Sequence, residues 1–252
     1  PHEPNLLRYL KEGGYDVRWW GKNDLLAPES FPLCTTTAGH AGPGPRFEVP
    51  PRNPYTLDDP RYYSFLYEPP VGPVEAHGDY RCVQAAIDYL ESRPSGPFCL
   101  YLPISFPHCP YEAPQPWHDL IDPAGIPALR PAELRGKPDY VQLIRRNRRL
   151  DELDPSFLCR INAVYLGMIG FVDHMLGRLL EAVERTGHAE DTTILVFSDH
   201  GDWAGDFGLV EKWPSALDDC LTRIPMIIRS PEHARGHVVA EPIEALDRKS
   251  VV

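Results

Sequence analysis

ILVFSDHGDWAGDFGLVEK, residues Ile194–Lys212, begins with four apolar residues and continues into Ser198, Asp199 and His200. A short apolar run that ends in turn-forming residues is typical of a parallel strand buried on both faces. In open α/β sheets, ligands bind beyond the carboxyl ends of the strands. The stretch therefore predicts an α/β sheet with a carboxylate and an imidazole at the edge where ligands bind.

The rest of the chain alternates between helical and strand patterns. Apolar residues recur at helical spacing in three segments, Asn5–Gly13, Asp79–Glu91 and Pro155–Arg185. Strand patterns occur in Tyr15–Trp20, Phe98–Ser105, Thr192–Phe197 and Ile224–Arg229. Strands that alternate with helices predict an α/β fold with a mostly parallel sheet.

Residues from about Ala27 to Val74 have a different composition. They are dense in proline, glycine, tyrosine and arginine, as in PGPRFEVPPRNP. A long stretch of this kind inside a compact domain is usually a functional or subfamily-specific insertion. We expect irregular structure there, with one short hairpin, and a position that shapes the substrate pocket.

The overall composition argues against some classes of partner. The 252-residue chain is 42% hydrophobic with a formal net charge of −11, so it can bury a core but has no general attraction for nucleic acid phosphates. No uninterrupted apolar run approaches the roughly 20 residues that span a bilayer, so we expect no membrane segment. The six cysteines are scattered, which favours free thiols and a cytoplasmic location. The oligomeric state stays open.

Polar side chains follow three of the predicted strands: Lys22, Asn23 and Asp24, then His108, then Asp199 with His200. A single histidine in such a place is more often a satisfied structural residue than a functional one. Three strand ends that all carry such groups favour a single shared site, because the carboxyl ends of parallel strands lie at one edge.

Asp199 and His200 form a candidate metal-ligand pair. A carboxylate oxygen beside an imidazole nitrogen suits zinc, manganese, magnesium or calcium, and the hard carboxylate leaves the choice open. The alternative is that Asp199 caps the next turn and His200 bonds to the backbone. Two ligands leave a metal site incomplete, so we expect the others to come from elsewhere.

Lys212 lies twelve residues after His200, across a loop that contains three glycines. It is either a solvated lysine or a fixed cation that neutralises a bound oxyanion and its leaving group. Lys22 and His108 admit the same two interpretations, and His108 is also a candidate proton donor.

Four segments together resemble the sulfatase family of the alkaline-phosphatase-like superfamily. GGYDVRWWGKND, residues 13–24, is similar to the family's AGY…GKWH segment, and PFCLYLPISFPHCPYEAP, residues 97–114, to PFFLYLSFxxPHxPY. The segment YLGMIGFVDHMLGRLLEAVE, residues 165–184, fits YYAxIxxVDxxVGRLL, and TTILVFSDHGDWAGDFGLVEKW, residues 192–213, fits TIVVFTSDHGEMLGDHGLxxKG. The last two segments are the more specific matches.

The resemblance implies a three-layer α/β/α sandwich around a mixed, mostly parallel sheet. It also implies hydrolysis of small-molecule sulfate esters by a formylglycine, made from the cysteine or serine of a CxPSR or SxPSR motif, together with a divalent cation. Calcium is the first expectation for that cation, with magnesium and manganese as alternatives. Asp199 and His200 match two of the family's metal ligands. Lys22, His108 and Lys212 match catalytic positions that contact the sulfate or the leaving-group oxygen.

Two features depart from common members of the family. Many arylsulfatases have Asp-Asn where this chain has Asp199 and His200, and the Asp-His pair resembles the branch of choline sulfatases and phosphonate monoester hydrolases. Hydrolysis of phosphonate monoesters or phosphate diesters is therefore the alternative activity. Asn23 and Asp24 stand where Trp-His is common, and we assign Asn23 to substrate binding in that altered half of the pocket.

No CxPSR or SxPSR motif occurs among the 252 residues. We therefore expect residues 1–247 to be part of a sulfatase catalytic domain that is incomplete at both ends, with its nucleophile and first metal-ligand pair upstream of Pro1. Residues 248–252, RKSVV, depart from the family pattern, and we expect them not to be native sequence. On its own, such a fragment is expected to bind an anion without measurable turnover.

Overall fold

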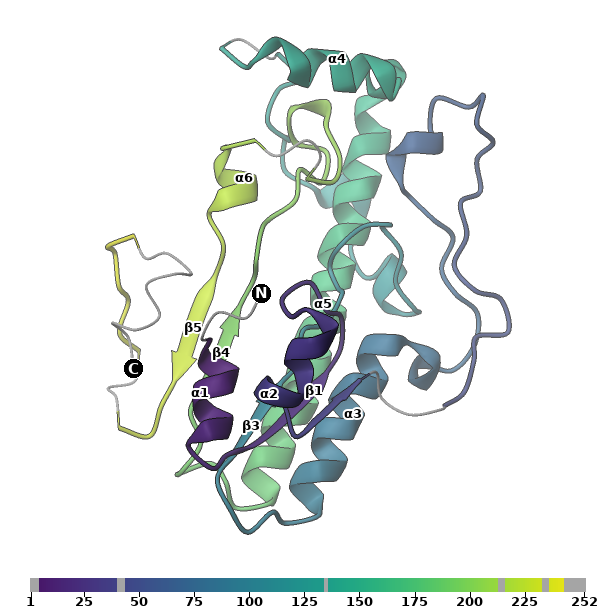
Figure 1. Cartoon of the computed structure of the whole chain (residues 1–252). Coiled ribbons are helices and arrows are strands. Elements are labelled where there is room, and N and C mark those ends of the chain that lie inside the picture. The colour runs from purple at the N-terminus through teal and green to yellow at the C-terminus, as the bar shows by residue number, and fades with distance from the viewer. Residues whose placement is uncertain (1–4, 40–43, 134–135, 213–215, 233–235, 243–252) are drawn as a thin grey trace.

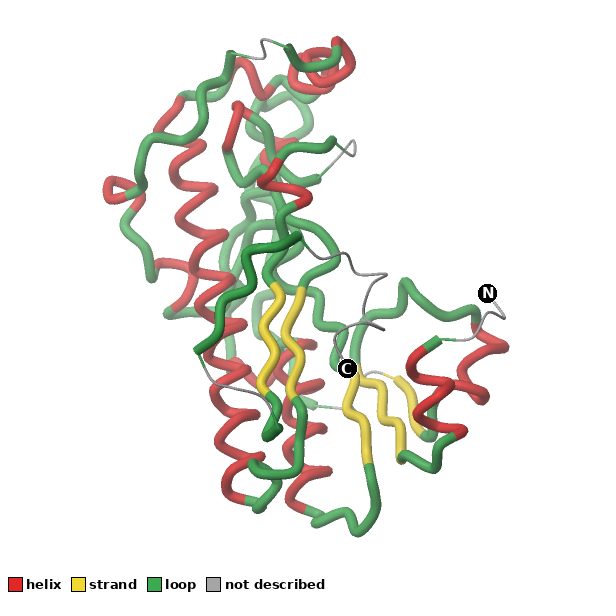
Figure 2. The backbone as a smooth tube through the Cα atoms, turned by 90° about the vertical axis from the view of Figure 1, so that its left-hand side faces the viewer, coloured by secondary structure: helices red, strands yellow, loops and turns green. Residues whose placement is uncertain are grey.

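The computed structural model of the chain describes residues 5–39, 44–133, 136–212, 216–232 and 236–242. Its strands lie between helices on two sides, as Figure 1 and Figure 2 show. Helix α1 (Leu6–Glu12) lies on one side, and helices α3 (Gly78–Glu91) and α5 (Pro155–Arg185) pack against each other on the opposite side. This arrangement is the α/β/α sandwich expected from the sequence. Residues 248–252, for which we expected a non-native tail, lie outside the described residues.

Strand β1 (Asp16–Trp20) is the central strand of a three-stranded parallel sheet. Its neighbours are β2 (Thr37–Gly39) and β3 (Phe98–Tyr101), in the order β2-β1-β3. Strand β3 ends earlier than predicted, because Pro103 has no N–H to donate to a ladder. Since β1 and β3 run in parallel, the loops that follow them begin at the same edge of the sheet.

Alternate residues of β1 face opposite helical layers, as the two-residue period of a strand requires. Val17 and Trp19 are buried on the α1 side, where the Trp19 ring lies 5.3 Å from the ring of Phe31 at the start of α2 (Phe31–Cys34). On the other face, the Arg18 guanidinium lies 5.0 Å from the ring centroid of Tyr89 in α3. The parallel sheet is therefore covered on both faces.

A second, antiparallel sheet consists of β4 (Ile194–Phe197) and β5 (Met226–Arg229). Ile194 pairs with Arg229 and Phe197 with Met226. Within the described ranges, β3 pairs only with β1, and β4 pairs only with β5, so both strands have one edge without a neighbour. The prediction of a parallel strand buried on both faces was wrong for β4, because its partner β5 runs antiparallel and Leu195 is 39% exposed. The strands are still mostly parallel, with this pair as the antiparallel component.

Side-chain caps begin three of the helices. Asn5 Oδ1 accepts a hydrogen bond from Arg8 N at 3.1 Å at the start of α1, and Asp154 Oδ1 accepts one from Ser156 N at 2.8 Å at the start of α5. At the start of α3 the acceptor is His77 Nδ1, which receives the Asp79 N–H at 3.2 Å. These caps satisfy backbone N–H groups that the first helical turn leaves free.

Helix α5 forms much of the core. Ile161, Met168 and Phe171 are completely buried against other parts of the protein. In the part of the chain that the structure describes, α5 is also the one helix that is long and apolar enough to cross a membrane by length and composition. Ten residues of α5 are buried, whereas Leu166 and Ile169 are 38% and 41% exposed.

The proline-rich stretch 27–74 is largely irregular, as expected. Antiparallel bridges join Val49 to Val71 and Arg52 to Glu68, and these form the expected hairpin. Helix α2, at residues 31–34, and strand β2, at residues 37–39, are elements that we did not predict. Residues 40–43 of the stretch lie outside the described residues.

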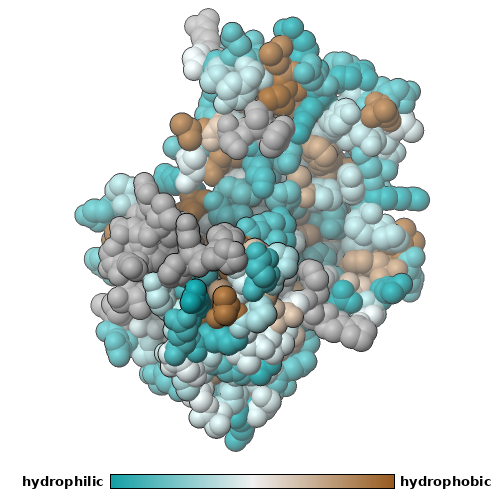
Figure 3. Space-filling model, viewed as in Figure 1, coloured by the Kyte–Doolittle hydropathy of each residue, from teal (hydrophilic) through white to brown (hydrophobic). Residues whose placement is uncertain are grey.

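The remaining elements are short. Helices α4 and α6 span Asp139–Asn147 and Asp219–Thr222. Single 3-10 turns occur at Pro28–Ser30, Tyr62–Ser64, Val74–Ala76, Trp117–Asp119, Pro123–Gly125, Leu150–Glu152 and Asp206–Gly208. The face of the molecule in Figure 3 is largely hydrophilic, with hydrophobic residues in small separate groups.

Candidate active site

Side chains from the three predicted strand ends meet in one place. The ring centroids of His108 and His200 lie 5.8 Å apart, and Lys212 Nζ lies 2.8 Å from His200 Nε2. Lys22 forms an ion pair with Asp24 at 2.7 Å. The Lys22 ammonium lowers the pKa of Asp24, and Lys212 and His108 act in the same direction. Four of the six candidates, Lys22, His108, His200 and Lys212, are therefore neighbours.

Lys22 reaches this place because β1 ends in Gly21. The backbone of Gly21 has a φ of +143°, and a Cβ there would lie 2.3 Å from the carbonyl oxygen of Pro103. The N–H of Lys22 donates to that same oxygen at 2.8 Å. Only glycine permits so close an approach, and it holds Lys22 beside the loop that carries His108.

Asn23 has a local role in the same loop. Its Nδ2 donates to Leu26 O at 2.8 Å, while its Oδ1 accepts from the N–H groups of Leu25 at 3.2 Å and Leu26 at 2.9 Å. This is the turn-stabilising pattern that asparagine favours. Both polar ends of the Asn23 side chain form hydrogen bonds with the backbone of this loop. A substrate contact by Asn23 therefore stays a prediction.

His108 and His200 are oriented in the same way. The Nδ1 atom of His108 lies 2.7 Å from Cys109 O, and the Nδ1 atom of His200 lies 2.7 Å from Gly201 O. Because a carbonyl oxygen can only accept, we assign the hydrogen to Nδ1 in both rings, which leaves the lone pair on Nε2. A backbone carbonyl on one nitrogen is the usual means of preparing the other for a metal or a proton.

Asp199 and His200 provide two of the donors that a divalent cation needs. The Asp199 side chain is 81% exposed, and its Oδ2 lies 3.7 Å from His200 Nε2, so oxygen and nitrogen donors lie side by side. Among the described residues, no group of three or more His, Cys, Asp or Glu side chains is arranged to hold a metal ion. The donor types of the pair fit part of a cation site, which requires further ligands. Because Lys212 Nζ lies 2.8 Å from His200 Nε2, a cation bound at that nitrogen also requires Lys212 to move.

The loop between His200 and Lys212 folds back on itself. Trp203 N donates to Glu211 O at 3.1 Å, and Gly205 N donates to Leu209 O at 2.9 Å. The backbone adopts the left-handed region at Gly205, with a φ of +99°, and again at Glu211, with a φ of +64°. These reversals return Lys212 to His200, as the separation in sequence suggested.

Tyr111 joins the His108 loop to the Lys212 loop. Its side chain is completely buried, and its hydroxyl donates to Asp202 Oδ1 at 2.6 Å and accepts from Glu211 N at 2.6 Å. Glu211 in turn pairs with Arg148 of the segment that follows α4, at 3.0 Å. One buried hydroxyl thus fixes the distance between the two loops.

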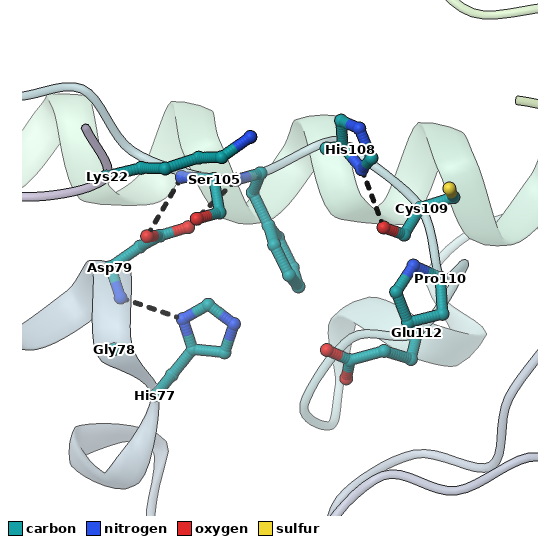
Figure 4. Close-up of a pocket in the computed structure, with 10 residues that line it drawn as sticks. Lys22, His77, Gly78, Asp79, Ser105, His108, Cys109, Pro110 and Glu112 are labelled. Atoms are coloured by element: carbon teal, nitrogen blue, oxygen red, sulfur yellow. Dashed lines mark hydrogen bonds between the residues drawn. The ribbon is translucent and has the colours of Figure 1, made fainter. Parts of the chain in front are cut away.

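A pocket of about 370 Å³ adjoins Lys22 and His108 (Figure 4). It is lined by Lys22, His77, Gly78, Asp79, Ser105, Phe106, His108, Cys109, Pro110 and Glu112. Four titratable residues of this lining, His77, Asp79, Cys109 and Glu112, were not among the candidates from the sequence. The signal for Glu112 was its place four residues after His108, in the same proline-rich loop.

Asp79 anchors the loop that carries His108. Its two carboxylate oxygens accept the N–H groups of Ser105 at 3.0 Å and Phe106 at 2.9 Å. His77 precedes it and packs edge-on against Phe106, with ring centroids 4.4 Å apart. Burial lowers the pKa of His77 and so favours its neutral form.

Glu112 differs from Asp79 because its carboxyl group is unsatisfied. The residue is 7% exposed, and its Oε2 atom is buried without a hydrogen-bond partner. Burial, with a smaller contribution from the Asp79 carboxylate, raises the pKa of Glu112 to about 7. The pocket therefore contains an acid that changes charge near neutral pH.

Known proteins are similar to this chain in sequence and in structure. The family model for Sulfatase matches residues 1–248. The chain belongs to the sulfatase family. Sulfatases are hydrolases that act on ester bonds, and enzymes of this family generally use a divalent metal ion.

Individual relatives from the sulfatase family match the chain over only part of their own length. The chain is 28% identical to the Multifunctional alkaline phosphatase superfamily protein PehA of Trinickia caryophylli, over 90% of the chain and 42% of that protein. It is 30% identical to an arylsulfatase of Clostridium perfringens, over 66% of the chain and 35% of that protein. The chain thus spans less than half the length of these curated relatives.

Solved structures show the same sulfatase-like fold. Phosphonate monoester hydrolase SpPMH from Silicibacter pomeroyi has a TM-score of 0.66 at 22% identity, over 95% of this chain and 55% of its own. The phosphonate monoester hydrolase of Agrobacterium radiobacter has a TM-score of 0.64 at 21% identity, over 91% of this chain and 53% of its own. These likenesses confirm the α/β/α fold.

Cys109 is not suited to serve as the nucleophile of this sulfatase, although it lines the pocket beside His108. A thiolate is the nucleophilic form of cysteine. Burial, aided by the charges of Glu211 and Asp202, raises the pKa of Cys109 to about 12. The thiol therefore stays protonated at neutral pH.

Replacing Tyr111 with phenylalanine is expected to lower the free energy of unfolding of the sulfatase by about 1–3 kcal/mol. The change removes the acceptor of the Glu211 N–H and one of the two donors to Asp202 Oδ1, which keeps the Ala204 N–H at 2.8 Å. A buried N–H group without a partner is costly. Urea denaturation followed by tryptophan fluorescence measures the loss. Tyr9→Phe, at an exposed position on α1, is the matched control and should stay within about 0.5 kcal/mol of wild type. Equal effects of the two changes would contradict the role given to Tyr111.

Glu112 makes the stability of the sulfatase depend on pH. The pKa of Glu112 rises from 4.5 to about 7 on folding, so the folded protein holds a proton that the unfolded chain releases across this range. Stability therefore falls as pH rises from about 4.5 to about 7. At about 1.4 kcal/mol per pKa unit, the contribution is on the order of 3 kcal/mol.

Glu112→Gln should remove this dependence, because the amide does not titrate. We expect the stability of the variant relative to wild type to increase by about 2–3 kcal/mol between about pH 5 and about pH 8. Urea denaturation at the two pH values gives the difference, with Glu75→Gln at an exposed position as control. A difference that does not change with pH would show that Glu112 does not hold the proton.

Proposed function

We propose that the intact protein hydrolyses small-molecule sulfate esters. The observation that supports this most is the convergence of Lys22, His108 and Lys212 beside Asp199 and His200. Fixed cations and hydrogen-bond donors aimed at one point stabilise the charge that develops on a tetrahedral oxyanion. Membership of the sulfatase family points to the same substrate class.

The residues of this chain take separate parts in the reaction. Lys212 and Lys22 neutralise the sulfate oxygens, and protonated His108 donates its Nε2 proton to the alcohol oxygen as its bond to sulfur breaks. A formylglycine located upstream of Pro1 would supply the hydroxyl that acts as the nucleophile toward sulfur. A divalent cation, with calcium as first choice and magnesium or manganese as alternatives, supplies further positive charge to the sulfate. Asp199 Oδ and His200 Nε2 would hold it.

Hydrolysis of phosphonate monoesters or phosphate diesters is the second candidate. The Asp199-His200 pair favours it, because this pair resembles that branch of the superfamily. Parallel assays of the full-length protein with p-nitrophenyl sulfate and with a p-nitrophenyl phosphonate monoester separate the two. We expect the higher kcat/KM with the sulfate, and a strong preference for the phosphonate would reverse the order.

The same preparation tests the metal and the nucleophile. Dialysis against a chelator should abolish hydrolysis, and calcium should restore it better than magnesium or manganese. The 252-residue chain, assayed beside the full-length protein, should bind inorganic sulfate without turnover. Hydrolysis by the chain alone would contradict an upstream nucleophile.

A further inference from the structure

The pocket beside the catalytic candidates has two chemically different ends. Lys22 and His108 border one end, and in Figure 4 the side chains of His77 and Glu112 point toward each other from opposite walls of the other end. No hydrogen bond joins His77 to Glu112 among the described residues. The first end suits an anion, whereas the second presents polar groups that still need partners.

The second end offers one donor and one acceptor. His77 Nδ1 accepts the Asp79 N–H at 3.2 Å, so the hydrogen of the neutral ring lies on Nε2. The Glu112 Oε2 atom is buried without a partner. A buried acceptor that lacks a partner costs about 1–3 kcal/mol, and a ligand that supplies a donor recovers that cost.

Asp79 shows what a purely structural carboxylate looks like in this pocket. Both of its oxygens are occupied by backbone N–H groups, those of Ser105 and Phe106. Glu112 is about as deeply buried as Asp79, at 7% against 5% exposed, and has neither contact. A carboxyl group whose role is to hold the fold does not explain this difference.

We propose that Glu112 and His77 recognise the alcohol half of the sulfate ester, and that they select an alcohol that carries a protonated amine. This inference rests on the proposed function, since the Lys22 and His108 end holds the anionic group. The substrate class is then an amino-alcohol sulfate, with a negative charge at one end of the pocket and an N–H donor at the other.

Charge explains why an ammonium is preferred to a hydroxyl. Either group satisfies Oε2, but an ammonium also offsets the charges of Glu112 and of the Asp79 carboxylate behind it. Hydrogen bonds to charged groups contribute more to binding than hydrogen bonds between neutral groups. A methyl group in the same position leaves Oε2 unsatisfied.

Three sulfonates that resist hydrolysis test the inference on the full-length protein. In 3-aminopropane-1-sulfonate, 3-hydroxypropane-1-sulfonate and butane-1-sulfonate the end group changes from ammonium to hydroxyl to methyl, at nearly constant size. We expect titration calorimetry at about pH 8 to show the aminosulfonate bound about 10-fold more tightly than butanesulfonate, with the hydroxysulfonate between them. Equal affinities for the three sulfonates would overturn the inference.

Glu112→Gln supplies the matched variant. It should bring the three affinities within about 2-fold of one another while leaving that of butanesulfonate unchanged within about 2-fold, because the anion end is untouched. An equal loss for all three sulfonates would show that Glu112 only supports the fold. Failure of wild type to bind inorganic sulfate or any sulfonate would instead contradict the proposed function, and this inference with it.

A second measurement uses wild type alone. An ammonium beside Glu112 favours the carboxylate, so binding of the aminosulfonate near neutral pH should release a proton. The heat of binding should then depend on the ionisation heat of the buffer, and it should not do so for butanesulfonate. The other titratable or charged groups around this pocket are His77, Asp79, Arg81, Lys22, His108 and Cys109. Loss of the effect in Glu112→Gln assigns the proton to Glu112. A buffer-independent heat in wild type would overturn the inference.

Discussion

Replacement of Lys212 with methionine is expected to lower kcat/KM of the intact protein for a sulfate ester about 100- to 1000-fold. The Lys212 ammonium lies 2.8 Å from His200 Nε2, inside the cluster that also includes His108. Removal of one preorganised group that stabilises a developing oxyanion costs about 2.7–4 kcal/mol of transition-state stabilisation. Methionine keeps the length of the side chain, so steady-state kinetics isolates the loss of charge.

Lys11→Met is the control for the change of net charge. The Lys11 ammonium donates to Pro32 O at 2.7 Å in the contact between α1 and α2, away from the cluster. Its replacement should leave kcat/KM within about 2-fold of wild type, since distant exposed charges are screened by salt. Similar losses in the two variants would show that total charge, and not the position of Lys212, governs the reaction.

Replacement of Gly201 with alanine is expected to destabilise the protein by about 1–3 kcal/mol and to weaken the proposed calcium binding of the intact protein about 10-fold. A Cβ at this position would lie 1.9 Å from the carbonyl oxygen of Cys220. The Gly201 N–H donates to Leu221 O at 2.8 Å, so the two backbone segments are also bonded to each other. Overpacking of this kind forces backbone movement, and that movement displaces the adjacent His200. Urea denaturation and calcium titration measure the two effects.

Gly177→Ala is the control variant, and we expect it to stabilise the protein. Gly177 lies within α5, and a Cβ there meets nothing within 4 Å. Alanine in a helix is more stable than glycine by about 0.5–1 kcal/mol, so this variant should be more stable than wild type. A Gly201→Ala protein within about 0.5 kcal/mol of wild type would show that the segments at residues 201 and 220 separate freely.

The sequence predicted the main elements of the fold because their periodicity is strong. The helical pattern at Pro155–Arg185 and the strand patterns around Asp16–Trp20 and Ile194–Phe197 appear at these positions in the structure. Strand β2 was missed because three residues are too few to show a period. Its place in the sheet depends on pairing with β1, which is a tertiary contact.

Part of the candidate site was also predicted from strand patterns in the sequence. Lys22, His108 and Asp199 directly follow strand patterns, so their position at one edge of the sheet could be inferred. Glu112 was missed although it lies four residues after His108, because its burial depends on tertiary packing that the sequence does not show. Asn23 was assigned by its position after Lys22, and only the structure shows that both ends of its amide serve the loop.

The edges of β3 and β4 that are unpaired among the described residues favour association between copies of this chain in solution. An open strand edge is a template for pairing with another molecule. On the same sheet Ile227 of β5, the strand that pairs with β4, is 60% exposed. Repulsion from the net charge of −11 opposes such contacts. That repulsion reaches about 30 Å at 0.01 M salt and only about 3 Å at 1 M. Concentrated solutions of the chain should therefore stay clear in dilute buffer and become turbid as salt is added.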